Sequence, residues 1–225
     1  MAAIKFDKQY DSATLAAEME SVFTDTWINH FNTKDFDGQW KSIALRSGTG
    51  NATDINANYT PLFTDTPLLE KLPYIKSILG EWQCEKETVR FMALYPGSEI
   101  KPHKDLGCSY QDGNFRLHIP ILTNDSVDFV VDGTNHKLRP GECWYMDFSK
   151  VHSVRNAGGT VRVHLVIDCL RNQWSDELFE QFGYLEEEKK MPIEQVKEMI
   201  AQLETHHNQT AENLILQLKQ QYGLS

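Results

Sequence analysis

The chain has 225 residues, of which 40% are hydrophobic and 11% aromatic, a composition typical of a folded globular protein rather than a disordered one. Its formal net charge of -10 at pH 7 predicts an acidic surface that repels phosphate backbones, which disfavours a nucleic-acid partner. No apolar run is long enough to cross a bilayer, and the N-terminus lacks the apolar core of a signal peptide. We therefore expect a cytoplasmic protein that does not enter a membrane and keeps its four cysteines reduced.

The N-terminal third is predicted to combine helices with one strand. Residues 12–31 place apolar side chains near one face of a helix, with Ser12 as the capping residue. Residues 38–48 are typical of a strand, and the polar residues 48–60, rich in Gly, Asn and Thr, predict a loop. A threonine followed by proline predicts a short helix within residues 66–80 that restarts at its second proline and ends at a glycine.

The middle of the chain consists of short segments rich in β-branched and aromatic residues, separated by Gly, Pro and Asp turns. Many short strands at this spacing indicate an antiparallel sandwich or barrel. The predicted strands are residues 88–95, 115–122, 127–131, 142–148, 151–156 and 161–168.

The C-terminal part changes to a composition rich in Glu, Gln, Lys and Leu. Two amphipathic helical segments are predicted there, the first starting at Pro192. We expect residues 1–170 to form one β domain including the N-terminal helices, and residues 171–225 to form a helical extension packed on it. The same helices could instead form a lid or a homodimer contact, and the amphipathic pattern is compatible with all three.

A candidate metal site is the H-x-D pair His103 and Asp105, together with His152. Residues i and i+2 of a strand point to one side, so the first two could reach the same ion. Two imidazoles and one carboxylate with open positions are the ligand set of non-haem Fe(II) oxygenases. Three protein ligands plus water are also a catalytic zinc pattern, so both metals stay open from these residues alone.

Two arginines extend this pattern toward an anion site. Arg162 follows His152 across a glycine turn, so a hairpin would place the two strands side by side. A guanidinium directed into an apolar barrel needs a counter-anion, and the far carboxylate of a 2-oxo acid would supply one. Arg116 and His118 share a strand face that could line the same site. The simpler alternative for Arg162 is an ion pair with a protein carboxylate, Asp147 or Asp168.

These residues together resemble the aspartyl/asparaginyl β-hydroxylase-like family of Fe(II)/2-oxoglutarate-dependent oxygenases. The resemblance covers most of residues 88–170, and Trp40 and Leu45-Arg46 are also similar to the family. The matching residues are Tyr95-Pro96-Gly97, Pro102-His103-Lys104-Asp105, Arg116-Leu117-His118 with Ile119-Pro120, Gly141 to Asp147, His152, Asn156, Arg162 and Asp168.

The resemblance implies a mainly β fold with flanking helices, a double-stranded β-helix (jelly roll, cupin-like) followed by the C-terminal helical segment. It implies that Fe(II) binds to His103, Asp105 and His152, and that 2-oxoglutarate binds to Arg116, His118 and Arg162. The implied reaction uses O2, hydroxylates an unactivated C–H bond and releases succinate and CO2; ascorbate is expected to help in vitro.

The identity of the substrate is predicted less precisely than the metal and the co-substrate. The family's eukaryotic peptide hydroxylases lack the carboxylate of H-x-D, so Asp105 places this chain nearer to bacterial members that act on free amino acids. Candidate substrate-binding residues are Trp40, Arg46, Tyr59 and Arg155, together with the loop Leu106–Asn114 that directly follows the metal ligands. The remaining histidines that we considered, His30, His136, His206 and His207, are interpreted as surface residues, and Cys108 as structural.

Three alternatives remain open at this point. A related enzyme could hydroxylate an Asp, Asn or other side chain within a peptide or protein. A cupin-like zinc hydrolase or isomerase would need no 2-oxo acid. A non-catalytic sensor could bind 2-oxoglutarate and a metal and signal through the C-terminal helices.

Overall fold

A computed structural model describes residues 1–24, 27–30, 33–57, 62–184, 193–205 and 209–224. The chain divides into two compact units, Met1–Leu185 and Glu186–Ser225. The helix α3 belongs to the first unit, beyond the boundary expected at residue 170, because Phe179 is buried in its core. Within the described ranges no helix is both long and apolar enough to span a membrane.

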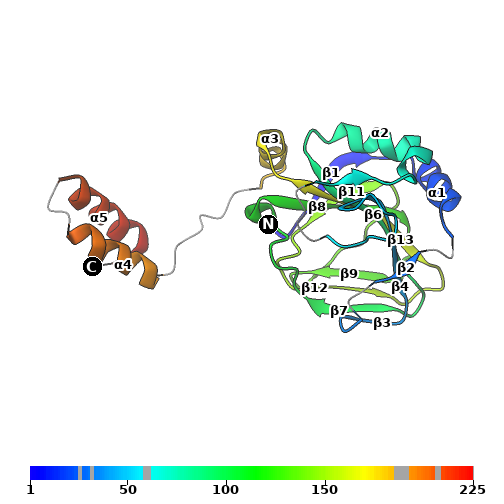
Figure 1. The fold of residues 1–225 in the computed structure, drawn as a ribbon. Coiled ribbons are helices and arrows are strands. Elements are labelled where there is room, and N and C mark those ends of the chain that lie inside the picture. Colours follow the sequence, from blue (N-terminus) through cyan, green and yellow to red (C-terminus); the bar gives the residue numbers. More distant parts are fainter. Residues whose placement is uncertain (25–26, 31–32, 58–61, 185–192, 206–208, 225) are drawn as a thin grey trace. The chain divides into compact units, whose positions relative to one another are not determined.

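Two antiparallel sheets form the first unit, and they face each other across its interior (Figure 1). The larger sheet has the strand order β1-β11-β8-β13-β6-β4-β2, with β5 paired to β4, and the smaller has the order β10-β9-β12-β7-β3. The strands of the larger sheet are β1 (Ala3–Gln9), β2 (Ile28–Asn29), β4 (Trp40–Ser47), β5 (Thr64–Asp65), β6 (Lys86–Leu94), β8 (Asn114–Leu122), β11 (Glu142–Met146) and β13 (Arg162–Leu170). Those of the smaller sheet are β3 (Phe36–Asp37), β7 (Glu99–His103), β9 (Val127–Val131), β10 (Thr134–Asn135) and β12 (His152–Asn156). The predicted antiparallel jelly roll is confirmed.

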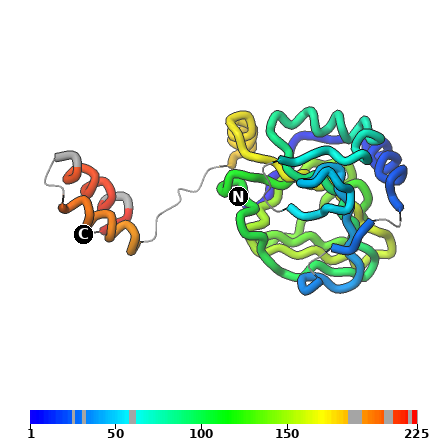
Figure 2. The backbone as a smooth tube through the Cα atoms, viewed as in Figure 1, coloured from blue at the N-terminus to red at the C-terminus, as the bar shows by residue number. Residues whose placement is uncertain are grey.

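Helices cover the outer face of the larger sheet (Figure 1). They are α1 (Ser12–Ser21), α2 (Pro73–Glu81) and α3 (Gln173–Gln181). The unit also contains two short 3-10 helices, η1 (Leu69–Lys71) and η2 (Tyr110–Asp112). Segments that are far apart in sequence lie side by side in the fold. The strand β1, for example, pairs with β11 (Figure 2). The predicted break within residues 66–80 is confirmed, because η1 ends and α2 begins with Pro73 at its first position.

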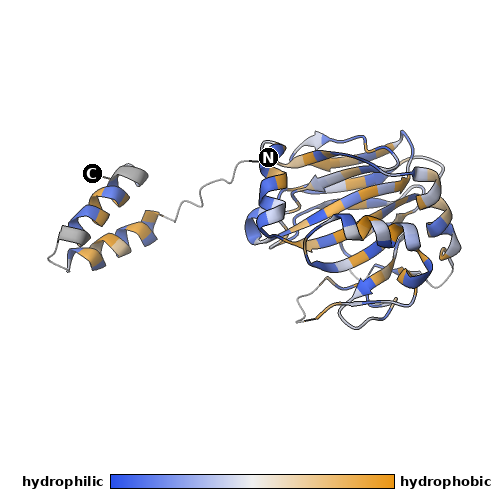
Figure 3. Ribbon diagram, turned by 90° about the horizontal axis from the view of Figure 1, so that it is seen from above, coloured by the Kyte–Doolittle hydropathy of each residue, from blue (hydrophilic) through white to orange (hydrophobic). Residues whose placement is uncertain are grey.

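The larger sheet separates an apolar layer from the site-bearing interior. Strand side chains alternate between faces, so hydrophobic and polar residues alternate along the ribbons of Figure 3. On β13, Val163, Leu165 and Ile167 pack against the helices in the larger core cluster. The side chains of the intervening residues point from the opposite face of the strand. These residues are Arg162, His164, Val166 and Asp168. This alternation lets one strand carry both core and site residues.

Two N-terminal predictions were wrong. The helix expected over residues 12–31 ends at Ser21, and Ile28–Asn29 pairs with β4 as a strand, where β-branched and aromatic residues favour extended backbone. The capping residue is Asp11 rather than Ser12, because its carboxylate accepts from the backbone N–H groups of Ala13 and Thr14. The first strand, β1, was not predicted at all.

The second unit contains the helices α4 (Ile193–Glu204) and α5 (Gln209–Tyr222). Val196, Ile200 and Ala211 are buried within it, which confirms the amphipathic pattern predicted for α4. Leu214 and Leu216 are exposed on α5. The packing of these helices on the β domain, their use as a lid and a homodimer contact through them stay predictions.

Candidate active site

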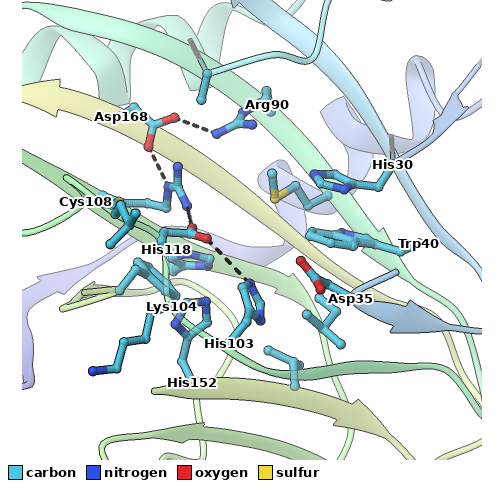
Figure 4. Close-up of a pocket in the computed structure, with 18 of the residues that line it drawn as sticks. His30, Asp35, Trp40, Arg90, His103, Lys104, Cys108, His118, His152 and Asp168 are labelled. Atoms are coloured by element: carbon cyan, nitrogen blue, oxygen red, sulfur yellow. Dashed lines mark hydrogen bonds and ion pairs between the residues drawn. The ribbon is translucent and has the colours of Figure 1, made fainter. Parts of the chain in front are cut away.

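A cavity of about 500 Å³ lies between the two sheets and collects most of the predicted site residues. Its wall carries His103, Asp105 and His152 as well as Arg116, His118 and Arg162. Figure 4 shows His103, His118 and His152 gathered on one side of this cavity, with Trp40 and His30 on the other. The structure therefore brings the two predicted sites, metal and anion, into one cavity of a size usual for small-molecule binding.

The three candidate metal ligands converge on one point. One ligand atom from each of His103, Asp105 and His152 lies within 4.8 Å of the others, and this was the one cluster of its kind found among the described residues. The Nε2 atom of His103 is 3.5 Å from Oδ1 of Asp105, and the two imidazole centroids are 4.2 Å apart. Strand pairing explains the approach of the histidines, because His103 on β7 lies directly opposite His152 on β12.

Asp105 reaches this cluster by a route that differs from the prediction. It was expected on the same strand as His103, but β7 ends at His103 and Asp105 follows two residues later, just before the turn at Leu106 and Gly107. Its backbone N–H donates to the carbonyl of Phe148 at 2.9 Å, which fixes the turn against the loop before His152. The carboxylate is thus held by a long-range backbone contact and not by strand geometry.

Both histidines are oriented for a metal by backbone carbonyls. Nδ1 of His103 lies 2.7 Å from the carbonyl of Lys101, and Nδ1 of His152 lies 3.1 Å from that of Lys150. A carbonyl can only accept, so each Nδ1 carries the hydrogen and each Nε2 keeps its lone pair for a metal. Burial lowers the pKa of His152, which keeps it neutral and able to act as a ligand.

Arg116 joins the candidate ligand Asp105 to a buried charge cluster. Its Nη1 donates to Oδ2 of Asp105 at 2.9 Å and its Nε to Oδ1 of Asp168 at 2.6 Å. Asp168 also accepts from Arg90 at 2.6 Å and from the hydroxyl of Thr88. Burial alone would raise the pKa of Asp168, but the two guanidinium groups outweigh it and hold this pKa well below its usual range. A dashed line in Figure 4 marks the contact between Arg90 and Asp168.

Arg162 has no such counter-charge among the residues that the structure describes. Its side chain is 2% exposed, and in the part of the chain that the structure describes it forms no ion pair with a carboxylate. Asp168, one of the two partners considered for it, is paired with Arg90 and Arg116 instead. The Nε atom of Arg162 has no hydrogen-bond partner, and burial lowers its pKa to about 9, so it stays charged at neutral pH. Burial of a guanidinium without an anionic partner is unfavourable, and none of the described carboxylates is its partner. Arg162 is therefore the strongest candidate in the cavity for binding an anionic ligand.

A second set of residues, Trp40, His30 and Asp35, lines the cavity opposite the metal cluster (Figure 4). The imidazole of His30 stacks on the indole of Trp40 with centroids 3.6 Å apart. The indole Nε1 is buried and has no hydrogen-bond partner. The prediction that His30 lies on the surface was wrong, because its side chain is buried against Trp40. This burial, together with the charge of Arg90, lowers the pKa of His30 to about 4.

The other substrate candidates are distributed differently. Arg46 pairs with Asp65 at 2.6 Å and is not among the residues that line the cavity, and Arg155 on β12 is exposed. Tyr59, His206 and His207 lie outside the described residues, and His136 is half-buried.

Of the loop predicted to contact substrate, Leu106, Gly107, Cys108 and Asn114 line the cavity. Tyr110 points away and is buried in the larger core cluster. Burial raises the pKa of Cys108 to about 11, as a structural thiol requires.

The sequence-based prediction missed Arg90 and His164. Both lie on strands of the larger sheet, with Arg90 two residues before Met92 on β6 and His164 two residues after Arg162 on β13. Residues two apart share a strand face. Alternation around the residues already chosen was therefore the signal that could have found His164.

Comparisons with known proteins show the family of this chain. The family model of aspartyl/asparaginyl β-hydroxylases matches residues 9–172. L-proline cis-4-hydroxylase of Rhizobium meliloti (strain 1021) is 28% identical over 165 residues, covering 71% of this chain and 58% of the relative. L-proline cis-3-hydroxylase 1 of a Streptomyces species is 23% identical over 180 residues, covering 75% and 60% respectively. The chain thus spans about 58–60% of the length of the curated relatives it matches.

A solved structure supports the fold. The non-haem α-ketoglutarate-dependent epimerase SnoN from nogalamycin biosynthesis superposes with a TM-score of 0.50 at 11% identity, covering 75% of this chain and 78% of SnoN. This likeness concerns the arrangement of the strands and agrees with the two-sheet jelly roll described above.

Proposed function

Because the chain belongs to the aspartyl/asparaginyl β-hydroxylase family, we propose that it is an Fe(II)/2-oxoglutarate-dependent dioxygenase that hydroxylates a C–H bond of a free amino acid or similar small molecule. One observation carries the proposal: a two-histidine, one-carboxylate cluster shares its cavity with a buried arginine that pairs with no carboxylate of the described residues. Zinc hydrolysis requires the first feature but gives no reason for the second.

The residues fit the metal that the family implies. His103, Asp105 and His152 would hold Fe(II) on one face, with the histidine lone pairs already directed by backbone carbonyls. Fe(II) bound there would supply the activation of O2, which is the oxidant: one oxygen atom would enter the C–H bond of the substrate, and the other would enter succinate as 2-oxoglutarate is oxidised and loses CO2. The chain's part is to orient the reactants and to exclude water from the cavity.

The proposed co-substrate residues are Arg116, His118 and Arg162. Arg162 would receive the far carboxylate of 2-oxoglutarate, because a buried guanidinium gains most from an anion that replaces its lost hydration. Arg116 lies nearer the metal cluster, where Asp105 and Asp168 already fix its direction. Asp105 in turn keeps its other oxygen toward His103.

The charges of the cavity favour a substrate without net charge. Among the described residues of its wall, four basic ones, Arg90, Lys104, Arg116 and Arg162, balance four acidic ones, Asp35, Glu87, Asp105 and Asp168. A divalent metal and a dianionic co-substrate also balance each other. A zwitterionic amino acid with a neutral side chain would keep this balance, whereas a charged side chain would add an uncompensated buried charge. The two proline hydroxylases among the relatives are consistent with this class.

The direct test is turnover of free amino acids. Purified protein with Fe(II), ascorbate and 2-oxoglutarate should release succinate when a neutral amino acid such as proline is added, and mass spectrometry should detect a product one oxygen atom heavier. The same panel should include acidic amino acids and Asp- or Asn-containing peptides. Preferential turnover of peptides would favour the side-chain hydroxylase alternative. The proposal would be contradicted if no tested compound led to succinate release and if 2-oxoglutarate alone were not converted to succinate either.

Trp40→Phe tests the substrate end of the cavity. The substitution keeps the aromatic ring that stacks on His30 and removes the unpartnered Nε1–H. If that N–H donates to the substrate, its loss should raise the KM for the amino acid by about tenfold, the usual value of one such hydrogen bond, while the KM for 2-oxoglutarate stays unchanged. Steady-state kinetics with each reactant varied in turn would check this, and an unchanged amino-acid KM would exclude the contact.

A further inference from the structure

A buried histidine to which the proposed reaction gives no role lies between two of the candidate co-substrate residues. His164 is 1% exposed and follows Arg162 by two residues on β13, so both side chains leave the same face. Its Nδ1 is 2.7 Å from Nη2 of Arg162 and 3.2 Å from Nδ1 of His118. All three side chains also approach Phe129, with its ring centroid 5.4 Å from the Arg162 guanidinium carbon.

The hydrogens of this group can be assigned from chemistry. A guanidinium only donates, so Nδ1 of His164 must be an unprotonated acceptor, and the neutral ring carries its hydrogen on Nε2. Burial, with the positive charge of Arg162, lowers the pKa of His164 well below its usual range, in agreement with a neutral ring. His118 faces the same lone pair with its own Nδ1, which must therefore be the protonated nitrogen. One acceptor atom thus fixes the directions of two donors.

We propose that His164 is a positioning residue that holds Arg162 in the orientation that receives 2-oxoglutarate. The inference rests on the proposed function, because it assumes that this anion is the ligand of Arg162. With Nη2 bound to His164, the guanidinium still has an unpartnered Nε–H for a carboxylate. A long side chain that is already ordered loses less conformational entropy when its ligand binds.

Two substitutions separate the acceptor from the bulk of the ring. His164→Leu fills similar space without an acceptor, whereas His164→Asn places its Oδ1 near the position of the missing Nδ1. Binding is measured by calorimetry on the full chain loaded with Mn(II) in the absence of O2, so no turnover is needed. The probes are 2-oxoglutarate and pyruvate, which has the same 2-oxo acid head but no distal carboxylate.

The expected result is selective. His164→Leu should weaken 2-oxoglutarate binding by about tenfold or more, as the loss of one hydrogen bond to a charged group implies. Pyruvate binding should change by less than about twofold, because pyruvate does not reach Arg162. His164→Asn should recover most of the 2-oxoglutarate affinity. His136→Leu, at a half-buried histidine that does not line the main cavity, is the matched control and should change neither affinity.

The outcomes distinguish this inference from the proposed function. Failure of the wild-type protein to bind 2-oxoglutarate would overturn both. Binding by the wild type with equal affinity in His164→Leu, or equal losses for 2-oxoglutarate and pyruvate, would overturn the positioning role alone. Nitrogen-15 NMR of the wild-type histidines gives a check that needs no variant: a protonated Nδ1 on His164 would overturn the inference, and an unprotonated Nδ1 supports it.

Discussion

Replacement of Arg162 by methionine is expected to weaken 2-oxoglutarate binding by about a hundredfold or more. The reason is the loss of a charge-assisted, potentially bidentate contact in a buried site, which typically costs a few kcal/mol. Within the described residues the other arginines of the cavity, Arg90 and Arg116, already hold Asp168 and Asp105. Neither is free to take over the far carboxylate without breaking an ion pair.

The same substitution should stabilise the protein that lacks ligand. In the structure Arg162 is buried beside His164 and Phe129, and no carboxylate of the described ranges pairs with its charge. A buried ion costs several kcal/mol even after the protein relaxes around it, and apolar replacements of whole buried ion pairs often stabilise by roughly 1–4 kcal/mol. We expect a gain of the same order for Arg162→Met. Activity and stability would then change in opposite directions, as expected where a binding site retains a costly charge.

Calorimetry with Mn(II)-loaded protein measures the first effect, and urea unfolding of the ligand-free protein measures the second. Arg155→Met is the matched control, because Arg155 is exposed on β12 and does not line the cavity. It should alter neither quantity by more than about 0.5 kcal/mol, the usual range for surface substitutions. An unchanged affinity for 2-oxoglutarate in Arg162→Met would show that another group holds the far carboxylate.

Strand alternation explains why much of this fold was predictable from sequence. The strand now called β13 reads as alternating core and site residues, and its pairing with β8 places Asp168 directly opposite Arg116. That period of two is a property of the backbone and needs no knowledge of the partner strand. β1 was missed for a related reason: its buried residues Ile4 and Phe6 form too short an alternation to stand out before β11 is known to pair with it.

The metal ligands could be predicted because their residue types are characteristic. Residues whose role depends on which face of a strand they occupy were harder to predict. His103, Asp105 and His152 could be chosen because few residue combinations bind Fe(II). Arg155 was chosen only for its charge. It is an odd number of residues from His152, so on β12 it faces the opposite side from the metal cluster. The odd spacing from His152 alone therefore argues against a place for Arg155 in the cavity.

Other features depend on contacts between distant segments. The Asp105 turn is fixed by the carbonyl of Phe148, and His30 is buried by its stacking on Trp40. Neither contact leaves a local pattern in the sequence, because the paired residues belong to different elements. A polar residue such as His30 therefore looks exposed until its tertiary neighbour is known.

His152→Ala is expected to abolish metal binding while the fold persists. Removal of one imidazole leaves only His103 and Asp105, and two protein ligands are too few to retain a divalent ion against water. The backbone of β12 is paired on both sides, since residue 152 lies between His103 on β7 and Val131 on β9. These ladder hydrogen bonds do not involve the imidazole. The side chain also belongs to neither hydrophobic core cluster, so the loss of packing should be modest, about 1–3 kcal/mol.

Equilibrium dialysis against Fe(II) or Mn(II), followed by metal analysis, would measure the binding, and circular dichroism with thermal unfolding would monitor the fold. Wild-type protein should bind one metal ion per chain, His152→Ala none, and the control His136→Ala one, because His136 contributes no ligand atom to the cluster. A variant that keeps its metal would place the centre elsewhere in the molecule. Global unfolding at room temperature would mean instead that the imidazole, wedged between Phe148 and His103 with centroids 4.6 and 4.2 Å away, supports the packing between the two sheets. Either result can be distinguished from the expected one, in which metal binding is lost and the jelly roll remains folded.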